Sequence, residues 1–418
     1  MTQISLFDGD NKLTIDKKVR LIELFAGYGS QSLALKYLGV PFEHHKICEW
    51  AIPSIQAYKD LHATDDNTDY SQGMTTEEVF EHLYKAGVSS NYNEPMTYEQ
   101  VKRLGDAKAR TIYNNIKATH NLVSVVNAKG KDFEITDTDK YCYVMTYSFP
   151  CQDLSKAGKG EGMAKGSGTR SGLLWEVERI LDEMGENLPQ ILLMENVPDV
   201  IGQNNIKHFA DWVKKLDSLG YTSKWQCMNA KNYGVPQNRD RCFMVSWLGD
   251  YYYDFPQPFK LTKRLKDVLE TNVPEKYYLS SRTLEQIAKW KSQQNPLEKV
   301  LGKNSISPCV TARGAGEEHS GMILCCEELE ETTNLRNNYM TFVADGKLIK
   351  EAQQKKNYRI RKLTPREAGR LMGVRDEDID KMSVNQSDSR LYHLYGDSIV
   401  VDVLCEIFKN MATNGGKQ

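Results

Sequence analysis

The sequence lacks the features that mark a membrane protein, a zinc protein or a disulfide-rich protein. No apolar run approaches the roughly 18 residues that a membrane-spanning helix needs. The 9 cysteines are odd in number and include no C-x-x-C pair, which argues against structural zinc and against a disulfide framework. Residues 1–12 are polar and acidic and show no secretory pattern. We therefore expect a cytoplasmic protein with no metal centre and no membrane contact.

An excess of charge of one sign is also missing. The 54 lysine and arginine residues nearly balance the 56 acidic residues, which gives a net charge of −2. Nucleic-acid binders usually carry a basic surface, so the overall charge does not indicate one, although net charge can hide local patches. With 40% hydrophobic and 26% charged residues the composition is globular, and 418 residues can bury a large core.

Predicted strands alternate with predicted helices along most of the chain. Apolar runs predict strands at 19–25, 44–48, 143–149, 191–194, 224–228 and 241–247. Helical spacing of apolar residues predicts helices at 31–38, 98–104, 108–117, 171–184, 208–219, 363–372 and 398–410. This alternation is typical of α/β proteins with a parallel, doubly wound, Rossmann-like sheet.

The composition and the hydrophobic periodicity of the sequence change at two places. Residues 64–120 are polar and contain a capping box at 75–78, which predicts a helical insertion. After about residue 248 tyrosines and prolines cluster and the periodicity becomes irregular. We expect one domain at 1–248, a second and smaller domain at 249–356, and a return to the first domain at 357–418.

Chemically active groups follow four of the predicted strands. They are a glycine turn at 27–29, Glu49 with Trp50, Cys151, and Glu195 with Asn196. The carboxyl ends of the strands in a doubly wound sheet gather at one crevice, where such proteins bind their ligands. We therefore expect these four groups to converge on one site.

The first two groups are typical of a nucleotide-like cofactor site. Gly27 and Gly29 before a helix let the backbone approach an anionic group, although Ser32 stands at the third glycine of the dinucleotide fingerprint. Glu49 lies where an acid binds ribose hydroxyls, and Trp50 could stack on an adenine. Each residue alone has a plainer explanation, as a tight turn, a solvated acid or a core aromatic.

Cys151 and Glu195 suit a covalent reaction. Cys151 follows a proline at a strand end, and a free thiol there needs activation to become a nucleophile. Glu195 ends an apolar run, where burial raises the pKa of a carboxyl group and suits it to donate a proton. A structural thiol and a helix-capping acid are the plainer interpretations, and both weaken when the two groups end neighbouring strands.

Two basic segments offer contacts to a polyanion. Residues 155–172 contain six glycines and a single acid. The basic side chains among them are Lys156, Lys159, Lys165 and Arg170. A glycine-rich basic loop beside a nucleophile suggests a lid over a polyanion. A second basic patch, at 355–366, contains no acid. Solvated surface is the plainer interpretation of both segments.

Six motifs, taken in order, resemble those of the bacterial DNA (cytosine-5)-methyltransferases. They are a cofactor turn Phe25-Ala26-Gly27-Tyr28-Gly29, a nucleophile motif Pro150-Cys151-Gln152, an acid motif Glu195-Asn196-Val197, an arginine pair Arg239 and Arg241, the segment 361–367, and a closing cofactor motif at 396–400. The similarity spans most of the chain outside roughly 64–120 and 250–350. The stretch 146–182 is similar to its counterpart in mollicute CpG methyltransferases, which does not transfer CpG specificity.

This resemblance implies a fold, that of an S-adenosylmethionine-dependent methyltransferase, and a role for each motif. The catalytic residues it implies are Cys151, Glu195, Arg239 and Arg241. The cofactor-binding residues it implies are Phe25, Ala26, Gly27, Tyr28, Gly29, Glu49, Trp50, Asp397 and Ser398. The DNA-binding residues we expect are Gln152, Ser155, Lys156, Lys159, Lys165, Arg170, Asn196 and Arg313. Segment 249–356 would be the target-recognition domain.

The resemblance also implies a reaction. A methyl group would pass from S-adenosylmethionine to C5 of a flipped-out cytosine in a short specific sequence of double-stranded DNA, leaving S-adenosylhomocysteine. A cognate restriction endonuclease could act separately on the same sequence, or the enzyme could be solitary or phage-borne. One active site per chain needs no second copy, so we expect a monomer that uses no metal.

Three positions depart from the family pattern. Ser30 replaces the usual final glycine of the first motif, and Asp397 stands where asparagine is common. Ser124 falls near the place of the acid that contacts the adenine amino group. None of the three is one of the catalytic groups.

Three other functions stay open at this point. A tRNA cytosine-5 methyltransferase would use the same motifs, but a separate module before residue 361 favours DNA. A non-catalytic protein that binds the cofactor or DNA is disfavoured by the intact Cys151 and Glu195. A nicotinamide-dependent dehydrogenase built on Gly27 and Gly29 leaves the cysteine and arginine motifs unexplained.

Overall fold

The chain divides into two compact units in the computed structural model. Unit 1 comprises Met1–Met228, Asp240–Gln257 and Val403–Gln418, and unit 2 comprises Asn229–Arg239 and Pro258–Asp402. The structure describes residues 12–150, 163, 165, 170–291, 295–312, 322–339, 341–344, 347–350 and 358–411. This division differs from the predicted domain boundaries chiefly at 358–402, which packs within unit 2. Among the described residues, no helix is both long and apolar enough to span a bilayer.

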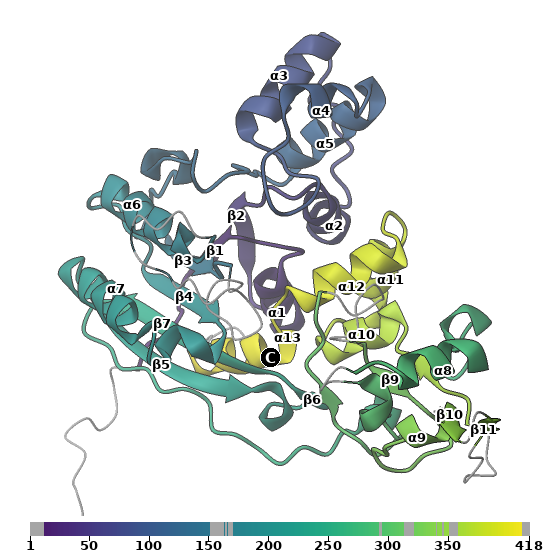
Figure 1. The fold of residues 1–418 in the computed structure, drawn as a ribbon. Helices are drawn as coiled ribbons and strands as arrows, with labels where there is room; N and C mark the ends of the chain where they lie inside the picture. Colours follow the sequence, from purple (N-terminus) through teal and green to yellow (C-terminus); the bar gives the residue numbers. More distant parts are fainter. Residues whose placement is uncertain are drawn as a thin grey trace, which may run out of the picture. The chain divides into compact units, whose positions relative to one another are not determined.

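Unit 1 contains the main sheet and its covering helices (Figure 1). Its strands are β1 (Lys18–Leu24), β2 (Phe42–Cys48), β3 (Tyr141–Tyr147), β4 (Ile191–Asn196), β5 (Tyr221–Asn229) and β7 (Asp240–Leu248). Its helices are α1 (Ser30–Leu38), α2 (Ile52–His62), α3 (Thr76–Ala86), α4 (Tyr98–Lys102), α5 (Asp106–Ala118), α6 (Leu174–Met184), α7 (Ile206–Ser218) and α13 (Val401–Asn410). Short 3-10 turns are η1 (Gly130–Phe133), η2 (Arg170–Leu173) and η3 (Pro198–Ile201).

The six strands form one sheet in the order β2-β1-β3-β4-β7-β5. Strands β1 to β4 pair in parallel, which confirms the predicted Rossmann-like α/β fold. Strand β7 departs from this parallel pattern, because it pairs antiparallel with β4. Only ten residues, 230–239, separate β5 from β7, and this connection is shorter than a parallel crossover requires. The first residues of β7 therefore lie at the carboxyl end of β4.

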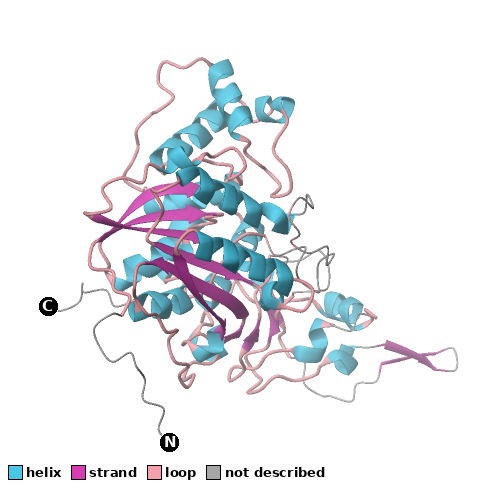
Figure 2. Ribbon diagram, turned by 90° about the vertical axis from the view of Figure 1, so that its left-hand side faces the viewer, coloured by secondary structure: helices cyan, strands magenta, loops and turns pink. Residues whose placement is uncertain are grey.

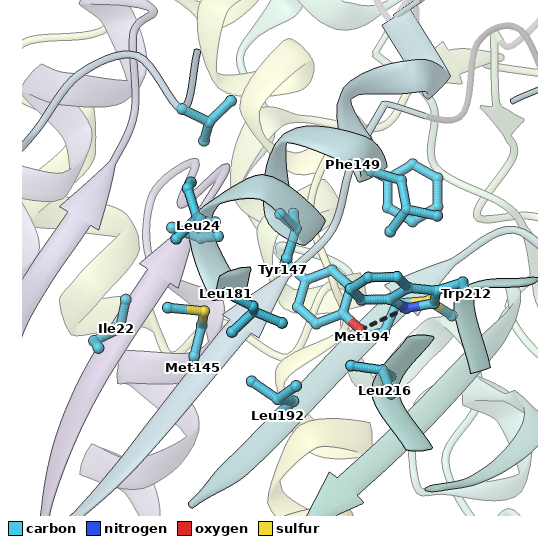
Figure 3. Close-up of a cluster of buried hydrophobic side chains, with 14 of the residues drawn as sticks. Ile22, Leu24, Met145, Tyr147, Phe149, Leu181, Leu192, Met194, Trp212 and Leu216 are labelled. Atoms are coloured by element: carbon cyan, nitrogen blue, oxygen red, sulfur yellow. Dashed lines mark hydrogen bonds between the residues drawn. The ribbon is translucent and has the colours of Figure 1, made fainter. Parts of the chain in front are cut away.

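One face of the sheet packs on α6 and α7 through a large apolar cluster (Figure 3). Alternate residues of the strands, such as Ile22 and Leu24 of β1, point into this cluster, as period-two alternation requires. The Trp212 indole N–H of α7 donates to the Tyr147 hydroxyl across 3.0 Å, so the buried polar tips of these two rings satisfy each other. Figure 2 shows the strands in magenta with helices packed against them.

The predicted insertion is helical and has its own core. Helices α3, α4 and α5 pack around buried residues that include Val79, Leu83 and Ile112, and Figure 1 shows them grouped together. The capping box at the start of α3 is confirmed, because Glu78 N–H donates to the Thr75 hydroxyl and Thr75 N–H donates to the Glu78 carboxylate.

Unit 2 is built of short elements. Its helices are α8 (Ser281–Ala288), α9 (Arg336–Tyr339), α10 (Pro365–Leu371), α11 (Asp376–Ser383) and α12 (Asp388–Gly396). Its strands are β6 (Gln237–Asn238), β8 (Ser307–Pro308), β9 (Leu324–Cys325), β10 (Thr341–Ala344), β11 (Lys347–Lys350) and β12 (Arg361–Lys362). Its 3-10 turns are η4 (Ala230–Asn232), η5 (Leu265–Asp267), η6 (Glu275–Tyr277) and η7 (Pro296–Lys299). The fully buried Arg361 makes a two-pronged ion pair with Glu367, which fixes β12 to α10.

Candidate active site

The turn after β1 has the backbone strain that glycine relieves. Phe25, Gly27 and Gly29 all have positive φ, at 58°, 57° and 81°. A Cβ atom on Gly29 would lie 2.5 Å from Nε2 of His62 and 2.8 Å from a ring carbon of Tyr58, so only glycine fits there. A Cβ atom on Gly27 would meet nothing within 4 Å. The turn is therefore closed by α2 behind Gly29 and open beside Gly27.

Glu49 clamps this turn from the end of β2. The Gly27 N–H donates to Glu49 Oε2 across 2.8 Å, and the Ala51 N–H donates to Oε1 across 2.7 Å. Strands β1 and β2 are parallel neighbours, and after a register shift between Leu21 and Ile22 they end with Leu24 beside Cys48, so the turn and Glu49 leave the sheet side by side. The sequence prediction that these two groups come together is confirmed. Glu49 is 7% exposed, so its carboxylate is held within the turn.

Asn121 is a residue of this site that the sequence analysis missed. Its Nδ2–H donates to the Glu49 carbonyl across 2.8 Å, and its Oδ1 accepts from the Glu49 N–H across 3.0 Å. Its Oδ1 also accepts from the N–H of Val123, which fixes the chain leading to Ser124. The sequence offers only a lone asparagine before an apolar run, and that signal does not indicate a partner 72 residues away.

Trp50 connects the segment that carries Glu49 to the insertion. Its ring is partly buried against the α3–α5 core, and its carbonyl accepts from the Ser89 N–H across 2.8 Å. The insertion thus packs directly on the residue after Glu49, and its core helps to hold the Trp50 ring in place.

The ends of β3 and β4 are tied together just before the predicted nucleophile. The Asn196 side-chain N–H donates to the Phe149 carbonyl across 3.0 Å, and the Ser171 hydroxyl donates to the Pro150 carbonyl across 2.7 Å. Asn196 is 2% exposed, so its side-chain amide holds the ends of β3 and β4 together. Cys151 follows directly in the sequence but lies outside the described residues.

Glu195 and Arg241 form an ion pair at the carboxyl end of β4. Arg241 Nε lies 3.0 Å from Glu195 Oε1, and both side chains are largely buried. The antiparallel register, in which Asn196 faces Cys242, carries Arg241 to this place. A guanidinium against a buried carboxylate makes a strong charge-assisted contact. The two residues that the sequence assigned to proton donation and ring binding therefore lie together.

Arg239, the other member of the arginine pair, has different partners. Its guanidinium donates to three backbone carbonyls of unit 2, those of Val310 (2.7 Å), Gly396 (2.9 Å) and Ser398 (2.5 Å). The backbone at Gly396 passes so close to 311–312 that a Cβ atom there would lie 1.9 Å from the Ala312 nitrogen. Arg239 is 3% exposed and thus fixes the backbone of the predicted closing cofactor motif. Asp397 in that motif pairs with His393 at 3.2 Å.

Most of the predicted DNA contacts lie outside the described residues. These are Gln152, Ser155, Lys156, Lys159 and Arg313. Lys165 is exposed and pairs with Glu178 at 2.8 Å, with its ammonium 5.4 Å from the centre of the Trp175 ring. Arg170 begins η2. No cluster of metal-ligating side chains occurs in the part of the chain that the structure describes, and the absence of a metal stays a prediction.

The comparisons with known proteins agree with these motifs. The sequence profile of the C-5 cytosine-specific DNA methylases matches residues 96–413. The chain is 33% identical to the type II methyltransferase M2.ScrFI of Lactococcus lactis subsp. cremoris over 94% of this chain and 99% of that one. It is also 33% identical to the orphan methyltransferase M.SssI of Spiroplasma monobiae, over 81% of this chain and 90% of that one.

Solved structures show the same fold. The crystal structure of the S. pombe Dnmt2 methyltransferase aligns with a TM-score of 0.62 over 94% of this chain and 98% of that one, at 18% identity. The Entamoeba histolytica methyltransferase EhMeth aligns with a TM-score of 0.61 at the same identity, over 95% of this chain and 98% of that one. The chain belongs to the C-5 cytosine-specific DNA methylase family, and is a DNA (cytosine-5)-methyltransferase with the fold of S-adenosylmethionine-dependent methyltransferases.

Proposed function

We propose that this enzyme methylates C5 of a flipped-out cytosine within a short specific sequence of double-stranded DNA, with S-adenosylmethionine as donor. The observation that carries the proposal is the Glu195–Arg241 ion pair at the carboxyl end of β4. The neighbouring Asn196 is hydrogen-bonded to Phe149, two residues before Cys151 in the sequence. A carboxylic acid and a guanidinium at one strand edge, together with a thiol that follows Pro150 in the sequence, can act on three positions of one pyrimidine ring. The proposed context is a restriction–modification system or a solitary, phage-borne enzyme.

The thiol of Cys151 begins the proposed reaction. Cytosine C5 is a poor nucleophile, and bonding of the Cys151 thiolate to C6 converts the ring into an enamine whose C5 is reactive. C6 is inaccessible in stacked DNA, so the base has to leave the helix. After C5 accepts the methyl group, loss of the C5 proton expels Cys151 and restores the aromatic ring.

Glu195 and Arg241 stabilise the charge that this attack creates. Negative charge develops on the ring as the sulfur bonds to C6, and proton donation from Glu195 to N3 relieves it. Arg241 hydrogen-bonds O2 and holds the ring in place. Glu195 and Arg241 pair with each other in this structure. When the base enters, Arg241 therefore contacts both Glu195 and O2 of the base. Arg239 supports the site by positioning backbone, because its donors are used by carbonyl groups.

The turn and Glu49 fit an adenosine-type cofactor. The space beside Gly27 is open, and we assign Glu49 to the ribose hydroxyls and Phe25 and Trp50 to the adenine. We assign Ala26, Gly27, Tyr28 and Gly29 to the methionine end of the cofactor, and Asp397 and Ser398 of unit 2 to cofactor binding. S-adenosylmethionine, when bound, supplies an electrophilic methyl group. We assign reading of the DNA sequence to residues 249–356, and DNA contacts to the predicted basic residues.

Sequencing of DNA with detection of methylated cytosine tests this function. DNA from cells that express the chain should carry modified cytosine at one short motif, and DNA from cells that express Cys151→Ala should not. Cys227→Ala, which removes an exposed thiol from β5, is the matched control and should methylate normally. Absence of modified cytosine in DNA, with modification of tRNA by the same preparation, would replace DNA by RNA as the substrate.

A further inference from the structure

A group of buried polar side chains lies behind the cofactor turn, on the sheet face opposite the α6–α7 cluster. Strand β1 alternates, so that Ile22 and Leu24 enter the apolar cluster while Glu23 between them points the other way. Glu23 is 0% exposed. Burying a carboxyl group costs several kcal/mol unless it is well hydrogen-bonded, and the proposed reaction makes no use of it. The burial of Glu23 therefore requires an explanation.

Glu23 joins helix α1 to helix α2. Its Oε2 accepts from the Ser32 hydroxyl across 2.6 Å and from the Tyr58 hydroxyl across 2.5 Å, and its Oε1 accepts from the Ser32 N–H across 3.3 Å. Ser32 lies in the first turn of α1, whose N-cap residue is Gly29 and offers no side chain. The carboxylate of β1 thus satisfies a helix-start amide that a capping side chain would normally bind.

Helix α2 in turn supports the cofactor turn. His62 lies one helical turn after Tyr58, and its Nε2–H donates to the Tyr28 carbonyl across 2.9 Å. The rings of Tyr58 and His62 contact each other at a tilt of 54°, with centroids 4.5 Å apart, directly behind Gly29. Contacts therefore run from Glu23 through Tyr58 and His62 to the backbone of the turn, and from Glu23 through Ser32 to the helix that leaves it.

We propose that Glu23 is a positioning residue for the cofactor turn, and that by joining α1 to α2 it sets the affinity for S-adenosylmethionine. This inference rests on the proposed function, since it takes residues 27–29 to hold the cofactor. Glu23 acts through Ser32, Tyr58 and His62 and does not itself touch the ligand.

The charge of Glu23 decides how well this connection works. A carboxylate accepts all three hydrogen bonds, whereas a protonated carboxyl group is itself a donor and loses one of the hydroxyl donors. Burial raises the pKa of Glu23 to about 7, although the hydrogen bonds from Ser32 and Tyr58 oppose this. Ionisation of Glu23 therefore falls within the ordinary working range, and cofactor affinity should rise as the pH increases from 6 to 8.

Two of the groups that face Glu23, His44 and Tyr58, stay neutral over this range. Burial, with repulsion from His120, lowers the pKa of His44 on β2 to about 4, and its Nδ1 lies 3.0 Å from the Tyr58 hydroxyl. Burial and the nearby Glu23 raise the pKa of Tyr58 well above its ordinary value. His62 of α2 donates its Nε2–H to the Tyr28 carbonyl. Among Glu23, His44 and Tyr58, Glu23 is thus the group that changes charge near neutral pH.

Stability should respond to pH with the opposite sign. The pKa of Glu23 is about 7 in the folded chain against 4.5 in the unfolded chain, so the folded state binds the proton more tightly. Its contribution to stability is complete below pH 4.5 and is lost as the pH rises through about 7. A residue that served the fold alone would lower affinity and stability together. Glu23 should instead raise affinity over the range in which its contribution to stability falls.

Calorimetric titration of S-adenosylhomocysteine into the full chain at pH 6, 7 and 8 tests the proposal. We expect the affinity of the unmodified chain to rise severalfold with pH. Glu23→Gln should bind about tenfold more weakly at pH 8, as loss of a charged hydrogen bond implies, and should lose the pH dependence. Tyr58→Phe should weaken binding and reduce the slope. The matched control is Glu43→Gln, which alters an exposed carboxylate on β2 that pairs with Lys18 and Arg20.

Each outcome decides between the two proposals. If Glu23→Gln or Tyr58→Phe binds the ligand like the unmodified chain with the same pH slope, Glu23 does not position the turn and the cofactor site stands. If binding weakens equally at every pH in step with the thermal midpoint, the role is structural and the inference fails. If the unmodified chain does not bind S-adenosylhomocysteine, the proposed cofactor site fails and this inference fails with it. Tyr58→Phe decides alone if Glu23→Gln does not fold.

Discussion

Two buried glutamates stand at strand ends of the same sheet, and their partners differ in kind. Glu49, after β2, accepts two backbone N–H groups, whereas Glu195, at the end of β4, pairs with the side chain of Arg241. Backbone donors are fixed by the fold, so Glu49 is suited to hold a constant shape for a ligand. A side-chain partner can be shared with an entering base. In the proposed mechanism, Glu49 therefore belongs to a static cofactor half and Glu195 to a reactive half of one sheet edge.

The strongest way to break this comparison is Glu195→Gln. An amide cannot donate the proton to N3, so we expect kcat to fall by about 10²–10⁴-fold, the usual range for loss of a general acid. The affinity for S-adenosylhomocysteine should stay within about twofold, because the cofactor half is untouched. Single-turnover methylation assays and calorimetry measure the two quantities. Equal losses in both would mean that the halves are coupled.

Arg241→Lys should have the next largest effect. A lysine keeps the charge beside Glu195 but cannot present the planar fork of donors to Glu195 and to O2 together. We expect kcat to fall by about 10²–10³-fold, as for loss of one preorganised donor to a developing charge. Single-turnover assays at saturating DNA check this prediction. Arg239→Lys serves as the contrast, because its partners are backbone carbonyls of unit 2, and it should lower thermal stability more than Arg241→Lys does.

Glu49→Gln sharpens the other side of the comparison. The amide can still accept from one backbone N–H, but its NH2 group faces the second donor, which disturbs the turn at Gly27. We expect the affinity for S-adenosylhomocysteine to fall about tenfold, with kcat at saturating cofactor reduced far less. Initial rates over a range of cofactor concentrations separate KM from kcat. A loss confined to kcat would assign Glu49 to the reactive half.

Much of this edge could be predicted from the sequence, because local patterns encode it. Apolar runs predict β1 to β4. Because β1 and β2 pair in parallel, the turn at 27–29 and Glu49 follow neighbouring strand ends and lie beside each other. The partners of Arg239 and Arg241 could not be predicted. The two arginines are two residues apart, yet Arg241 of β7 pairs with Glu195 and Arg239 binds carbonyls 71 to 159 residues away.

Helix α2 was missed for a similar reason. Its apolar residues gave a short and weak pattern, and the contacts of Tyr58 and His62 with Glu23 and Tyr28 exist only after the strands have paired. The same holds for Asn121, whose amide fits the backbone of Glu49 in three dimensions. Sequence patterns predicted which groups reach the edge, and packing decides which neighbour each of them meets.

The smallest effect is expected from Thr75→Ala, which tests whether the insertion belongs to the cofactor half. Removing the cap leaves helix-start N–H groups of α3 unsatisfied and should cost about 1 kcal/mol of stability, measured by denaturant unfolding. Trp50 packs on the α3–α5 core, whereas Glu49 is held by backbone groups and by Asn121. We therefore expect unchanged cofactor affinity and unchanged kcat. A weaker affinity with normal kcat would show instead that the insertion supports Trp50 against the ligand, and would extend the static half of the site into the insertion.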